Sequence, residues 1–436
     1  MKTVSVLGGG ESGVGAALLA QQKGYKVFVS DFGSIPEKYK SELLECKIPF
    51  EERGHSFEKI VDSDIIIKSP GIPVESKLIK KLIAQGKKHI SEIEFASKFY
   101  NGQVISVTGS NGKSTTVSLI YHLLHIAGLN VGLGGNIGYA FSRLLIEEKD
   151  YDYIVLELSS FQLDDVYDFL SDIAVLLNIS ADHLDRYDYD INKYAAAKWR
   201  LVERVRTGGT AILNKEDVLT QGLLERNPVT ENVIQISSED PIESLSKDNG
   251  DLFEINLLGK HNLFNAAVAK EVTRLLNIPE EVIQKGLLGF SALEHRLEKV
   301  AVIDGVTYIN DSKATNVDSV KYALSAVDAL KIWIAGGTDK GNDYTELVEL
   351  VKGNVKVLIC LGVDCEKLKT SFNNVVPEIL ETQSMSEAVQ MAHQKAEDNE
   401  VVLLSPACAS FDLFDNYIHR GNEFKKEVFK IESGIL

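Results

Sequence analysis

The sequence lacks the features that mark secreted, zinc-binding and membrane-spanning proteins. Its four cysteines form no CxxC pair and have no His-rich run beside them, which indicates neither a zinc site nor a disulfide framework. No stretch approaches the ~18 consecutive apolar residues that cross a bilayer. The N-terminus enters a strand pattern without the apolar core of a signal peptide. We therefore expect a cytoplasmic protein without membrane insertion.

Positive charge is also scarce. The chain has 63 acidic against 46 basic residues, a formal net charge of -17, which argues against nucleic acid or an anionic membrane as the main partner. Anionic small molecules remain possible ligands wherever lysine and arginine gather locally. With 436 residues the chain exceeds the size at which a single core stops growing, so two or three domains are expected.

A glycine-rich turn follows the first strand pattern. Thr3 to Leu7 form a β-branched run, and Gly8, Gly10 and Gly13 then open a helical pattern with the G-x-G-x-x-G spacing. Asp31 ends the next apolar run, near the position of a ribose-binding acid. This stretch alone is compatible with a nicotinamide or flavin site, and equally with a turn that only packs a helix on a strand.

Strand patterns alternate with helical patterns along almost the whole chain, which predicts doubly wound α/β domains with mostly parallel sheets. The predicted strands each run into a polar or glycine loop: VFVSD, DIIIKSPG, QVISVT, YIVLE, DIAVLLNIS, TAILN, KIWIAGG, KVLICLG and VVLLSPA. Breaks are expected near residues 95 and 295. The polar stretch 215–251 is compatible with either a peripheral subdomain or long loops.

A second glycine turn, TGSNGKSTT, carries a phosphate-binding signal. It follows a strand and opens an amphipathic helix, so its backbone amides can hold phosphates, with Lys113 reaching the terminal ones and Ser114 or Thr115 holding Mg²⁺. Val107 stands where the usual motif has its first glycine. Glu157 ends an apolar strand, the position from which an acid completes a magnesium shell.

Two further positions are ambiguous from the residues alone. His183 lies in a loop beside Asp182, Asp185 and Arg186, although most isolated histidines are structural. Lys198 follows three alanines on a predicted helix, and small neighbours leave a lysine room to turn inward. Helical periodicity by itself favours the alternative, an exposed lysine whose stem covers apolar surface.

Ten motifs in a fixed order resemble the Mur ligases, the ATP-dependent amide-forming family of peptidoglycan synthesis. They span essentially the whole chain: TGSNGKSTT, GGNIG, LELSSFQL, DHLDRY, the Lys198 helix, GKHNLFNAAVA, EHRLE, NDSKATN, GGTDKG and SPACASFDLFDNYIHRGNEF. SSFQLD and SPACASFD resemble the D-glutamate-adding members most. The resemblance implies a Rossmann-like UDP-sugar domain at 1–95, a central phosphate-loop ATPase domain at 96–295 and a Rossmann-like amino-acid domain at 296–436.

The chemistry that this resemblance implies is ATP-dependent ligation through an acyl phosphate, with UDP-N-acetylmuramoyl-L-alanine and D-glutamate as substrates. ATP and two Mg²⁺ ions are the implied cofactors. Four residues would hold metal, directly or through water: Ser114, Glu157, His183 and Lys198, the last as a carbamate formed with CO₂. A carbamate requires a neutral amine, which lysine can supply. Lys113, Glu157, His183 and Lys198 are the implied catalytic residues.

The implied binding residues fall into three sets. The UDP-sugar set is Ser12, Asp31, Ser69, Gly71, Asn136 and His183; the ATP set is Gly109, Ser110, Asn111, Gly112, Lys113, Ser114, Thr115, Asn265, Arg296, Asp311 and Lys313; the D-glutamate set is Thr315, Lys340, Ser405 and Phe414. From the residues alone, Lys340 could instead be a turn lysine and Phe414 a core aromatic. Phe32-Gly33 departs from the family pattern, which has a polar and then a basic residue after the acid.

Three other functions are compatible with parts of the sequence. A nicotinamide oxidoreductase explains the first 31 residues but leaves Lys113, Glu157 and NDSKATN without roles. A nucleotide-sensing module needs the phosphate loop but not Lys340. Folylpolyglutamate-type and other Mur enzymes share the centre of the chain, so the acceptor amino acid is the point to test. We expect a monomer.

Overall fold

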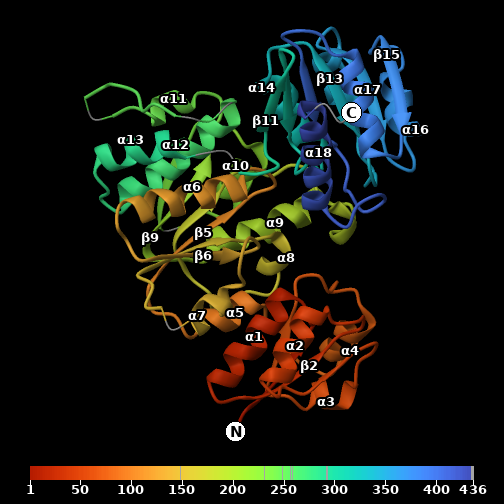
Figure 1. Ribbon diagram of the computed structural model, residues 1–436. Coiled ribbons are helices and arrows are strands. Elements are labelled where there is room, and N and C mark those ends of the chain that lie inside the picture. The colour runs from red at the N-terminus through yellow and green to blue at the C-terminus, as the bar shows by residue number, and fades with distance from the viewer. Residues whose placement is uncertain are drawn as a thin grey trace. The chain divides into compact units, whose positions relative to one another are not determined.

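The computed structural model divides the chain into two compact units (Figure 1). The first contains Met1–Ile255 and Phe264–Gly289, and the second contains Asn256–Leu263 and Phe290–Leu436. The structure describes residues 1–147, 149–229, 231–247, 249–255, 257, 259–290 and 293–433. Within these ranges no helix is long and apolar enough to cross a membrane.

The first sheet has four parallel strands in the order β3-β2-β1-β4, which are Thr3–Leu7 (β1), Lys26–Ser30 (β2), Phe50–Glu51 (β3) and Ile65–Lys68 (β4). Four helices accompany it: Glu11–Gln22 (α1), Glu37–Glu45 (α2), Phe57–Val61 (α3) and Lys77–Ala84 (α4). The inward residues of α1 are mostly glycine, alanine and valine, which allows the helix to pack closely on the sheet.

The second sheet lies in the same unit and has six parallel strands in the order β10-β9-β8-β5-β7-β6. Its strands are Gln103–Thr108 (β5), Val131–Gly135 (β6), Tyr153–Glu157 (β7), Ser171–Leu176 (β8), Val205–Asn214 (β9) and Asn232–Ile236 (β10). Its helices are Glu92–Ser97 (α5), Lys113–Ile126 (α6), Phe141–Ile146 (α7), Ser160–Leu163 (α8), Leu184–Arg186 (η1), Ile191–Glu203 (α9), Val218–Arg226 (α10), Pro241–Ser244 (α11), Lys260–Leu275 (α12) and Glu280–Gly289 (α13).

The first two sheets share one hydrophobic core, which runs from Val4 and Val29 to Leu156 and Trp199. An ion-pair cluster links α1 and α7 beside this core. Arg143 contacts Glu11 through Nε at 2.9 Å and Glu42 through Nη1 at 2.7 Å. Apolar burial and a partly buried charge cluster therefore both join the two sheets within the first unit.

The third sheet forms the second unit and has the order β11-β12-β16-β13-β14-β15. Its strands are Glu298–Ile303 (β11), Val306–Asn310 (β12), Lys331–Ala335 (β13), Val355–Leu361 (β14), Glu378–Thr382 (β15) and Val401–Leu404 (β16). Among the strand pairs of this sheet within the described ranges, β11–β12 is antiparallel and the other four are parallel. The helices are Val317–Ala326 (α14), Thr345–Leu347 (η2), Val348–Val351 (α15), Glu366–Phe372 (α16), Met385–Lys395 (α17) and Tyr417–Glu432 (α18).

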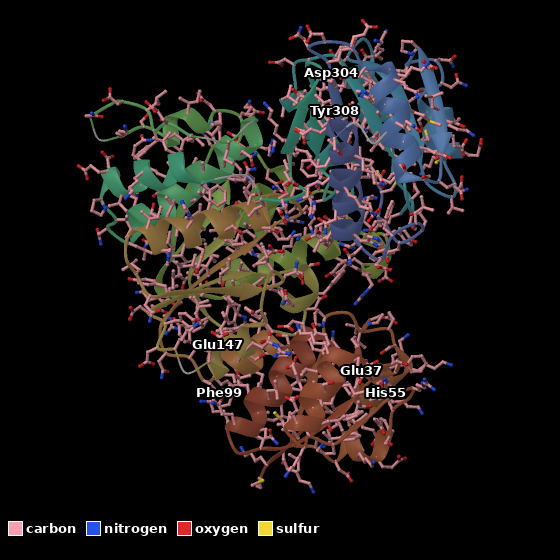
Figure 2. All side chains as sticks on the ribbon, in the orientation of Figure 1. Glu37, His55, Phe99, Glu147, Asp304 and Tyr308 are labelled. Atoms are coloured by element: carbon pink, nitrogen blue, oxygen red, sulfur yellow. The ribbon has the colours of Figure 1, made fainter. Side chains whose placement is uncertain are left out.

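The three-domain α/β architecture is confirmed, and each strand expected from its apolar run is present. The boundaries near residues 95 and 295 stay predictions. Within the polar stretch 215–251, β10 joins the edge of the second sheet, so the described part of this stretch is neither a separate subdomain nor only loops. The antiparallel hairpin was not predicted: Asp304 and Gly305, both with positive φ, form its two-residue turn, and Figure 2 labels Asp304 there.

Candidate functional site

The glycine turn after β1 is closed by the acid at the end of β2. Asp31 accepts a hydrogen bond from the Gly9 amide at 2.6 Å and one from the Gly33 amide at 2.7 Å. Gly8 has φ +96°, and a Cβ on Gly13 would lie 1.9 Å from the Gly8 carbonyl oxygen. The backbone geometry therefore requires glycine at both positions, and Asp31 holds two turns together.

The loop after β4 completes this edge of the first sheet. Ser69 faces the glycine turn, because a Cβ on Gly8 would lie 2.6 Å from Ser69 Oγ, and this buried hydroxyl has no hydrogen-bond partner within the described ranges. Arg186, from η1 of the second sheet, donates to the carbonyls of Pro70 and Gly71, both at 3.3 Å. The structure thus brings Asp31, Ser69 and Gly71 to one edge.

The phosphate loop after β5 is shaped by two glycines and one asparagine. Gly109 has φ +155° and Gly112 has φ +86°, and α6 begins at Lys113. Asn178 fixes the loop, since its Oδ1 accepts from the Asn111 amide at 2.8 Å and its Nδ2 donates to the Asn111 carbonyl at 3.0 Å. Sequence reasoning missed Asn178, which sits in the NIS loop directly after a predicted strand.

Two lysines meet on one carbonyl of this loop. Lys113 Nζ and Lys198 Nζ each donate to Gly109 O at 2.7 Å, and Lys113 also donates to Ser110 O at 2.9 Å. Lys198 is only 1% exposed, and its Nζ lies 4.5 Å from the centre of the Tyr194 ring. Burial, together with the neighbouring Lys113, holds the pKa of Lys198 well below its usual value. The exposed-lysine interpretation is wrong, and the inward orientation is confirmed.

Glu157 ends β7 beside the loop and is almost fully buried. Asn136 donates to its Oε1 at 2.8 Å, which joins a predicted sugar residue to a predicted metal ligand. Glu157 and Asp182 both oppose the fall in the pKa of Lys198, so both carboxylates lie within its electrostatic reach.

His183 has φ +54° and its Nε2 lies 3.6 Å from Asp182 Oδ2. Its ring packs against Phe161, with the two ring centroids 5.3 Å apart. His183 remains partly exposed. His183 therefore lies next to Asp182, whose carboxylate is within electrostatic reach of Lys198.

The carboxylates and histidines of the described ranges form no group of three or more that could hold a metal ion by itself. This composition still fits Mg²⁺ bound together with a nucleotide, because magnesium commonly takes one or two carboxylates and fills its other positions with phosphate oxygens and water. Glu157 provides the buried carboxylate, and Ser114, the second residue of α6, provides a hydroxyl.

The remaining predicted nucleotide residues lie on both units. In the first unit, a Cβ on Gly112 would lie 2.7 Å from Asn265 Oδ1, so Asn265 borders the phosphate loop. In the second unit, Asp311 is buried and accepts from Ser405 Oγ at 3.0 Å and from the Leu297 amide at 3.2 Å. Burial raises the pKa of Asp311 to about 7.

Arg296 and Lys313 lie near Asp311 on the second unit. Arg296 is close enough to oppose the rise in the pKa of Asp311. Burial, with a smaller effect of Arg296, lowers the pKa of His261 to about 4. The ammonium of Lys313 lies 3.9 Å from the centre of the Tyr417 ring, which keeps it at this edge of the third sheet.

The predicted amino-acid residues differ in their surroundings. Ser405 is fully buried, and its hydroxyl is engaged with Asp311. Lys340 is exposed in the loop after β13, and Thr315 is half-buried before α14. Phe414 is half-buried and packs on the core of the third sheet. Its ring lies edge-on to the His419 ring, with the two ring centroids 5.7 Å apart. The structure joins Ser405 to Asp311, a predicted nucleotide residue, whereas Phe414 packs against the core.

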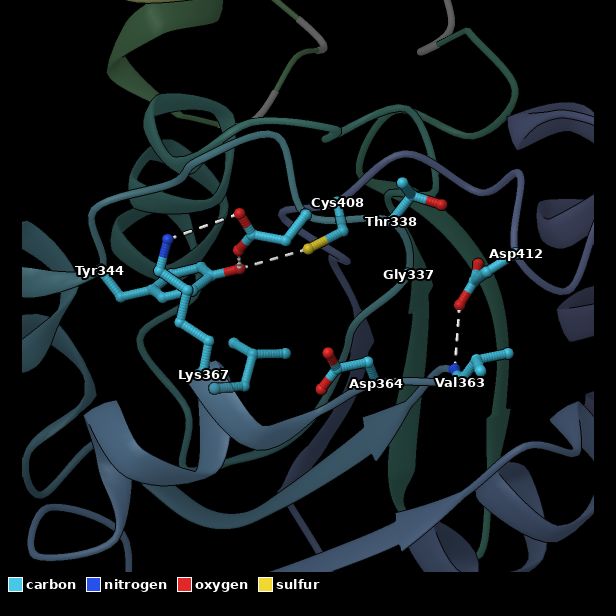
Figure 3. Close-up of a pocket in the computed structure, with 10 residues that line it drawn as sticks. Gly337, Thr338, Tyr344, Val363, Asp364, Lys367, Cys408 and Asp412 are labelled. Atoms are coloured by element: carbon cyan, nitrogen blue, oxygen red, sulfur yellow. Dashed lines mark hydrogen bonds and ion pairs between the residues drawn. The ribbon is translucent and has the colours of Figure 1, made fainter.

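A pocket of about 390 Å³ opens at the carboxyl ends of β13, β14 and β16 (Figure 3). Ten residues line it: Gly337, Thr338, Asp339, Tyr344, Val363, Asp364, Lys367, Leu368, Cys408 and Asp412. Lys367 Nζ lies 3.5 Å from Asp339 Oδ1, and the Tyr344 hydroxyl donates to Asp339 Oδ2 at 2.8 Å. Figure 3 labels Lys367 and Tyr344 in this pocket. Loops at these strand ends are the usual ligand sites of α/β sheets.

Arg420 is a second residue that sequence reasoning missed. It is almost fully buried on α18, and its guanidinium donates to Ser312 O at 2.9 Å, Cys408 O at 3.1 Å and Gly336 O at 3.4 Å. It thus ties together three loops at the pocket edge. Burial lowers the pKa of Arg420 to about 10. The available signal was its spacing, since Arg420 stands four positions before Phe424 and eight before Val428 and so shares their buried helix face.

Comparison with protein families matches three segments of the chain. The MurD N-terminal domain matches residues 3–78, the Mur ligase middle domain matches 107–273, and the Mur ligase glutamate ligase domain matches 295–408. Two relatives carry the name UDP-N-acetylmuramoylalanine--D-glutamate ligase. The one from Christiangramia forsetii is 47% identical and the one from Bacteroides fragilis 45%, each over 98% of this chain and 99% of its own length.

Solved structures give the same fold at lower identity. A pseudomurein peptide ligase type C from Methanothermus fervidus aligns with a TM-score of 0.62 at 19% identity, over 99% of this chain and 100% of that one. UDP-N-acetylmuramate-alanine ligase from Thermotoga maritima aligns with a TM-score of 0.61 at 19% identity, over 100% of both chains. These two likenesses concern the fold alone.

Proposed function

The chain belongs to the Mur ligase family, and we propose that it joins D-glutamate to UDP-N-acetylmuramoyl-L-alanine with the consumption of ATP. The substrate carboxylate takes the γ-phosphoryl group to give an acyl phosphate, and the amine of D-glutamate then displaces phosphate. The reaction belongs to cytoplasmic peptidoglycan precursor synthesis, and the enzyme acts as a monomer. The observation that carries the proposal is the full-length likeness at 47% identity to a ligase of this name.

The phosphate loop is the proposed ATP site. Lys113 Nζ donates to two carbonyls of the loop, which keeps its ammonium at the position where phosphate groups would bind. Ser114, Glu157 and His183 are the proposed holders of two Mg²⁺ ions. When bound, Mg²⁺ neutralises the negative charge of the phosphoryl group and of the carboxylate that attacks it.

Lys198 is the proposed site of a carbamate. Its amine attacks CO₂, an N–C bond forms, and one proton leaves, so a cation becomes a carboxylate. The low pKa that burial gives Lys198 supports this step, because only the neutral amine has a free electron pair. A carboxylate on Lys198 would also place a negative charge beside the Lys113 ammonium, which now opposes a positive charge on Lys198.

The nucleotide sugar is proposed to bind at the glycine turn after β1, with Ser12, Asp31, Ser69, Gly71, Asn136 and His183 around it. The unpartnered hydroxyl of Ser69 supports this site, because a buried polar group normally has a partner and a ligand would supply one. Phe32, which follows Asp31, is 78% exposed, and its ring lies 6.0 Å from that of His55. Base contacts on this side are therefore aromatic rather than polar and basic.

The third sheet carries the proposed D-glutamate site, with Thr315, Lys340, Ser405 and Phe414, and the proposed ATP residues Arg296, Asp311 and Lys313; Asn265 completes the ATP set from the first unit. A dicarboxylate amino acid needs an ammonium and hydroxyl or amide donors. The exposed ammonium of Lys340 supports its role, because it can meet an incoming carboxylate.

The acceptor amino acid distinguishes this function from its neighbours in the family. Purified enzyme with ATP, Mg²⁺ and the nucleotide sugar is offered L-alanine, D-glutamate and diaminopimelate, and the product is identified by mass. A product that gains one glutamyl residue only with D-glutamate supports the proposal. Addition of another amino acid would overturn the substrate assignment, and reduction of a nicotinamide cofactor in its place would overturn the ligase itself.

A further inference from the structure

Three charged or polar side chains form a buried cluster where the first sheet meets the second. Lys68 Nζ lies 2.9 Å from Asp165 Oδ2, and His89 Nε2 lies 3.1 Å from Asp165 Oδ1. The side chains are only 2%, 8% and 5% exposed for Lys68, His89 and Asp165. None of the three belongs to a predicted binding set.

Each member comes from a different part of the first unit. Lys68 is the last residue of β4, and Asp165 follows α8 and the SSFQL run. His89 precedes Ile90, whose carbonyl accepts from the Lys68 amide at 2.9 Å. The backbone repeats the link, because the Ser91 amide donates to the Asp165 carbonyl at 2.9 Å. The cluster therefore fixes the end of β4 to the loop after α8.

Burying charged groups in such a cluster costs folding free energy, so a functional role is the better explanation for its presence. Moving an ammonium and a carboxylate out of water costs free energy. Their mutual attraction often does no more than offset this cost. An apolar pair of similar size would hold the two sheets together at least as well. His89 Nδ1 is also buried without a hydrogen-bond partner among the described residues, so the ring is held through its Nε2 proton alone. Apolar packing does not account for this choice of residues.

The cluster controls the shape of the turn that follows β4. Lys68 Nζ donates to the Ile72 carbonyl at 3.1 Å, and the Ile72 amide donates to Ser69 O at 3.1 Å, so the ammonium closes the turn 69–72. Arg186 holds the opposite side of the same turn through the Pro70 and Gly71 carbonyls. The Ser69 hydroxyl is thereby directed at the glycine turn without a partner of its own.

We propose that Lys68, Asp165 and His89 are positioning residues for the nucleotide sugar, which hold the turn 69–72 in the form that receives the anionic part of this substrate. The inference rests on the proposed function, since it assumes that the nucleotide sugar binds at this turn. It assigns a binding role to residues that contact each other rather than the substrate. Asp165 is the centre, because each of its carboxylate oxygens meets one of the other two side chains.

A variant that removes both charges separates positioning from folding. Loss of one partner alone would strand a buried charge, whereas the double variant Lys68→Met/Asp165→Asn leaves no uncompensated ion. Its thermal unfolding is expected to stay close to that of the wild type. The KM for the nucleotide sugar is expected to rise about tenfold, with kcat and the KM values for ATP and D-glutamate within about twofold, because only one turn is released.

His89 offers a conservative rescue. His89→Gln keeps an N–H donor near the position of Nε2 and is expected to retain the wild-type KM for the nucleotide sugar, whereas His89→Leu is expected to raise it. Lys80→Met is the matched control, since Lys80 lies on α4 a few residues after the turn and forms an exposed pair with Glu75. This control is expected to change none of the constants.

Calorimetric titration with the nucleotide sugar, without ATP or D-glutamate, distinguishes the two levels of the proposal. If the wild type does not bind this ligand, the proposed function fails, and the positioning role fails with it. If the wild type binds and the folded double variant binds equally well, the positioning role alone is overturned. Equal losses of affinity for the nucleotide sugar and for ATP in a folded variant would also overturn it, because they indicate general structural damage.

Discussion

Two glycine turns in the first unit have the same backbone design and different charges around them. Both connect a buried parallel strand to a helix, and both use glycines with positive φ, Gly8 in the first and Gly109 and Gly112 in the second. The first turn is held by a carboxylate, that of Asp31. In the second, two lysine side chains, Lys113 and Lys198, donate to one carbonyl, with Glu157 nearby.

This difference shows what a glycine turn does and does not reveal. Glycines allow a backbone to approach an anion closely, so both turns indicate an anionic ligand. The charges beside each turn indicate its chemistry. A turn without lysine on its carbonyls is suited to binding an anion, whereas a turn with two lysines and a carboxylate nearby is suited to transferring a phosphoryl group. Interpreting the first turn alone as a nicotinamide site would therefore leave out the phosphate loop and its lysines.

The largest effect is expected from replacing Lys198, the buried lysine that donates to the Gly109 carbonyl. Lys198→Met is predicted to lower kcat by roughly a hundredfold to a thousandfold, because it removes a buried group that stabilises the charges of the transfer step. Steady-state phosphate release measures it. Lys193→Met is the matched control on the same helix, where Lys193 forms an exposed pair with Asp188. Wild-type activity in Lys198→Met would refute the carbamate and the role of the two lysines together.

Alanine at one glycine of each turn should separate the two ligands. In Gly13→Ala the new Cβ meets the Gly8 carbonyl oxygen, and in Gly112→Ala it meets Asn265 Oδ1 at a left-handed φ. Gly13→Ala is predicted to raise the KM for the nucleotide sugar about thirtyfold and to leave that for ATP nearly unchanged, and Gly112→Ala is predicted to do the reverse. If both variants weakened the same substrate, the comparison between the turns would be wrong.

A third glycine turn, residues 336–341 after β13, extends the comparison to the amino acid. Gly336 and Gly337 have φ near +130°, and Lys340 is exposed in this loop. Lys340→Ala is predicted to raise the KM for D-glutamate about tenfold and that for ATP far less, through loss of one charge-assisted contact. Lys352→Ala, an exposed lysine after α15, is the control. Equal changes in both KM values would remove Lys340 from the amino-acid site.

The smallest effect is expected at the first turn. Ser69→Ala removes a hydroxyl that has no partner within the described ranges, so the melting temperature is predicted to stay constant or rise slightly. The KM for the nucleotide sugar is predicted to rise about threefold, since one neutral hydrogen bond to the ligand is lost. Differential scanning fluorimetry and initial rates measure both. A lower melting temperature with an unchanged KM would indicate that Ser69 serves the fold only.

Much of the fold and part of the site could be predicted from local pattern. Apolar runs that end in polar or glycine loops predicted strands in each of the three sheets, although β3, β6, β10, β11, β12 and β15 were not predicted. Glu157 was expected at a strand end, where it lies. The antiparallel β11–β12 hairpin had a usable signal, the Asp304-Gly305 turn, which local reasoning passed over. Tyr308, which Figure 2 labels on β12, belongs to the core that this hairpin helps to cover.

The rest of the site depends on contacts between residues far apart in the chain. Helical periodicity favoured an exposed Lys198, because the pattern of one helix contains no information about distant partners. The Gly109 carbonyl, 89 positions earlier, accepts a hydrogen bond from the Lys198 amine. Asn178, Arg420 and Asp165 were missed for the same reason: each acts on loops that come from other strands. The role of such residues follows only once the strand ends have been brought together.

Phosphate release from ATP and Mg²⁺ tests the proposed ligase most directly. The enzyme is supplied with UDP-N-acetylmuramoyl-L-alanine and with D-glutamate, L-glutamate or no amino acid, and a parallel series omits the nucleotide sugar. We predict sustained release only when both the nucleotide sugar and D-glutamate are present. Equal release without either substrate, or release that follows L-glutamate instead, would contradict the assignment of the three sheets to a nucleotide sugar, ATP and D-glutamate.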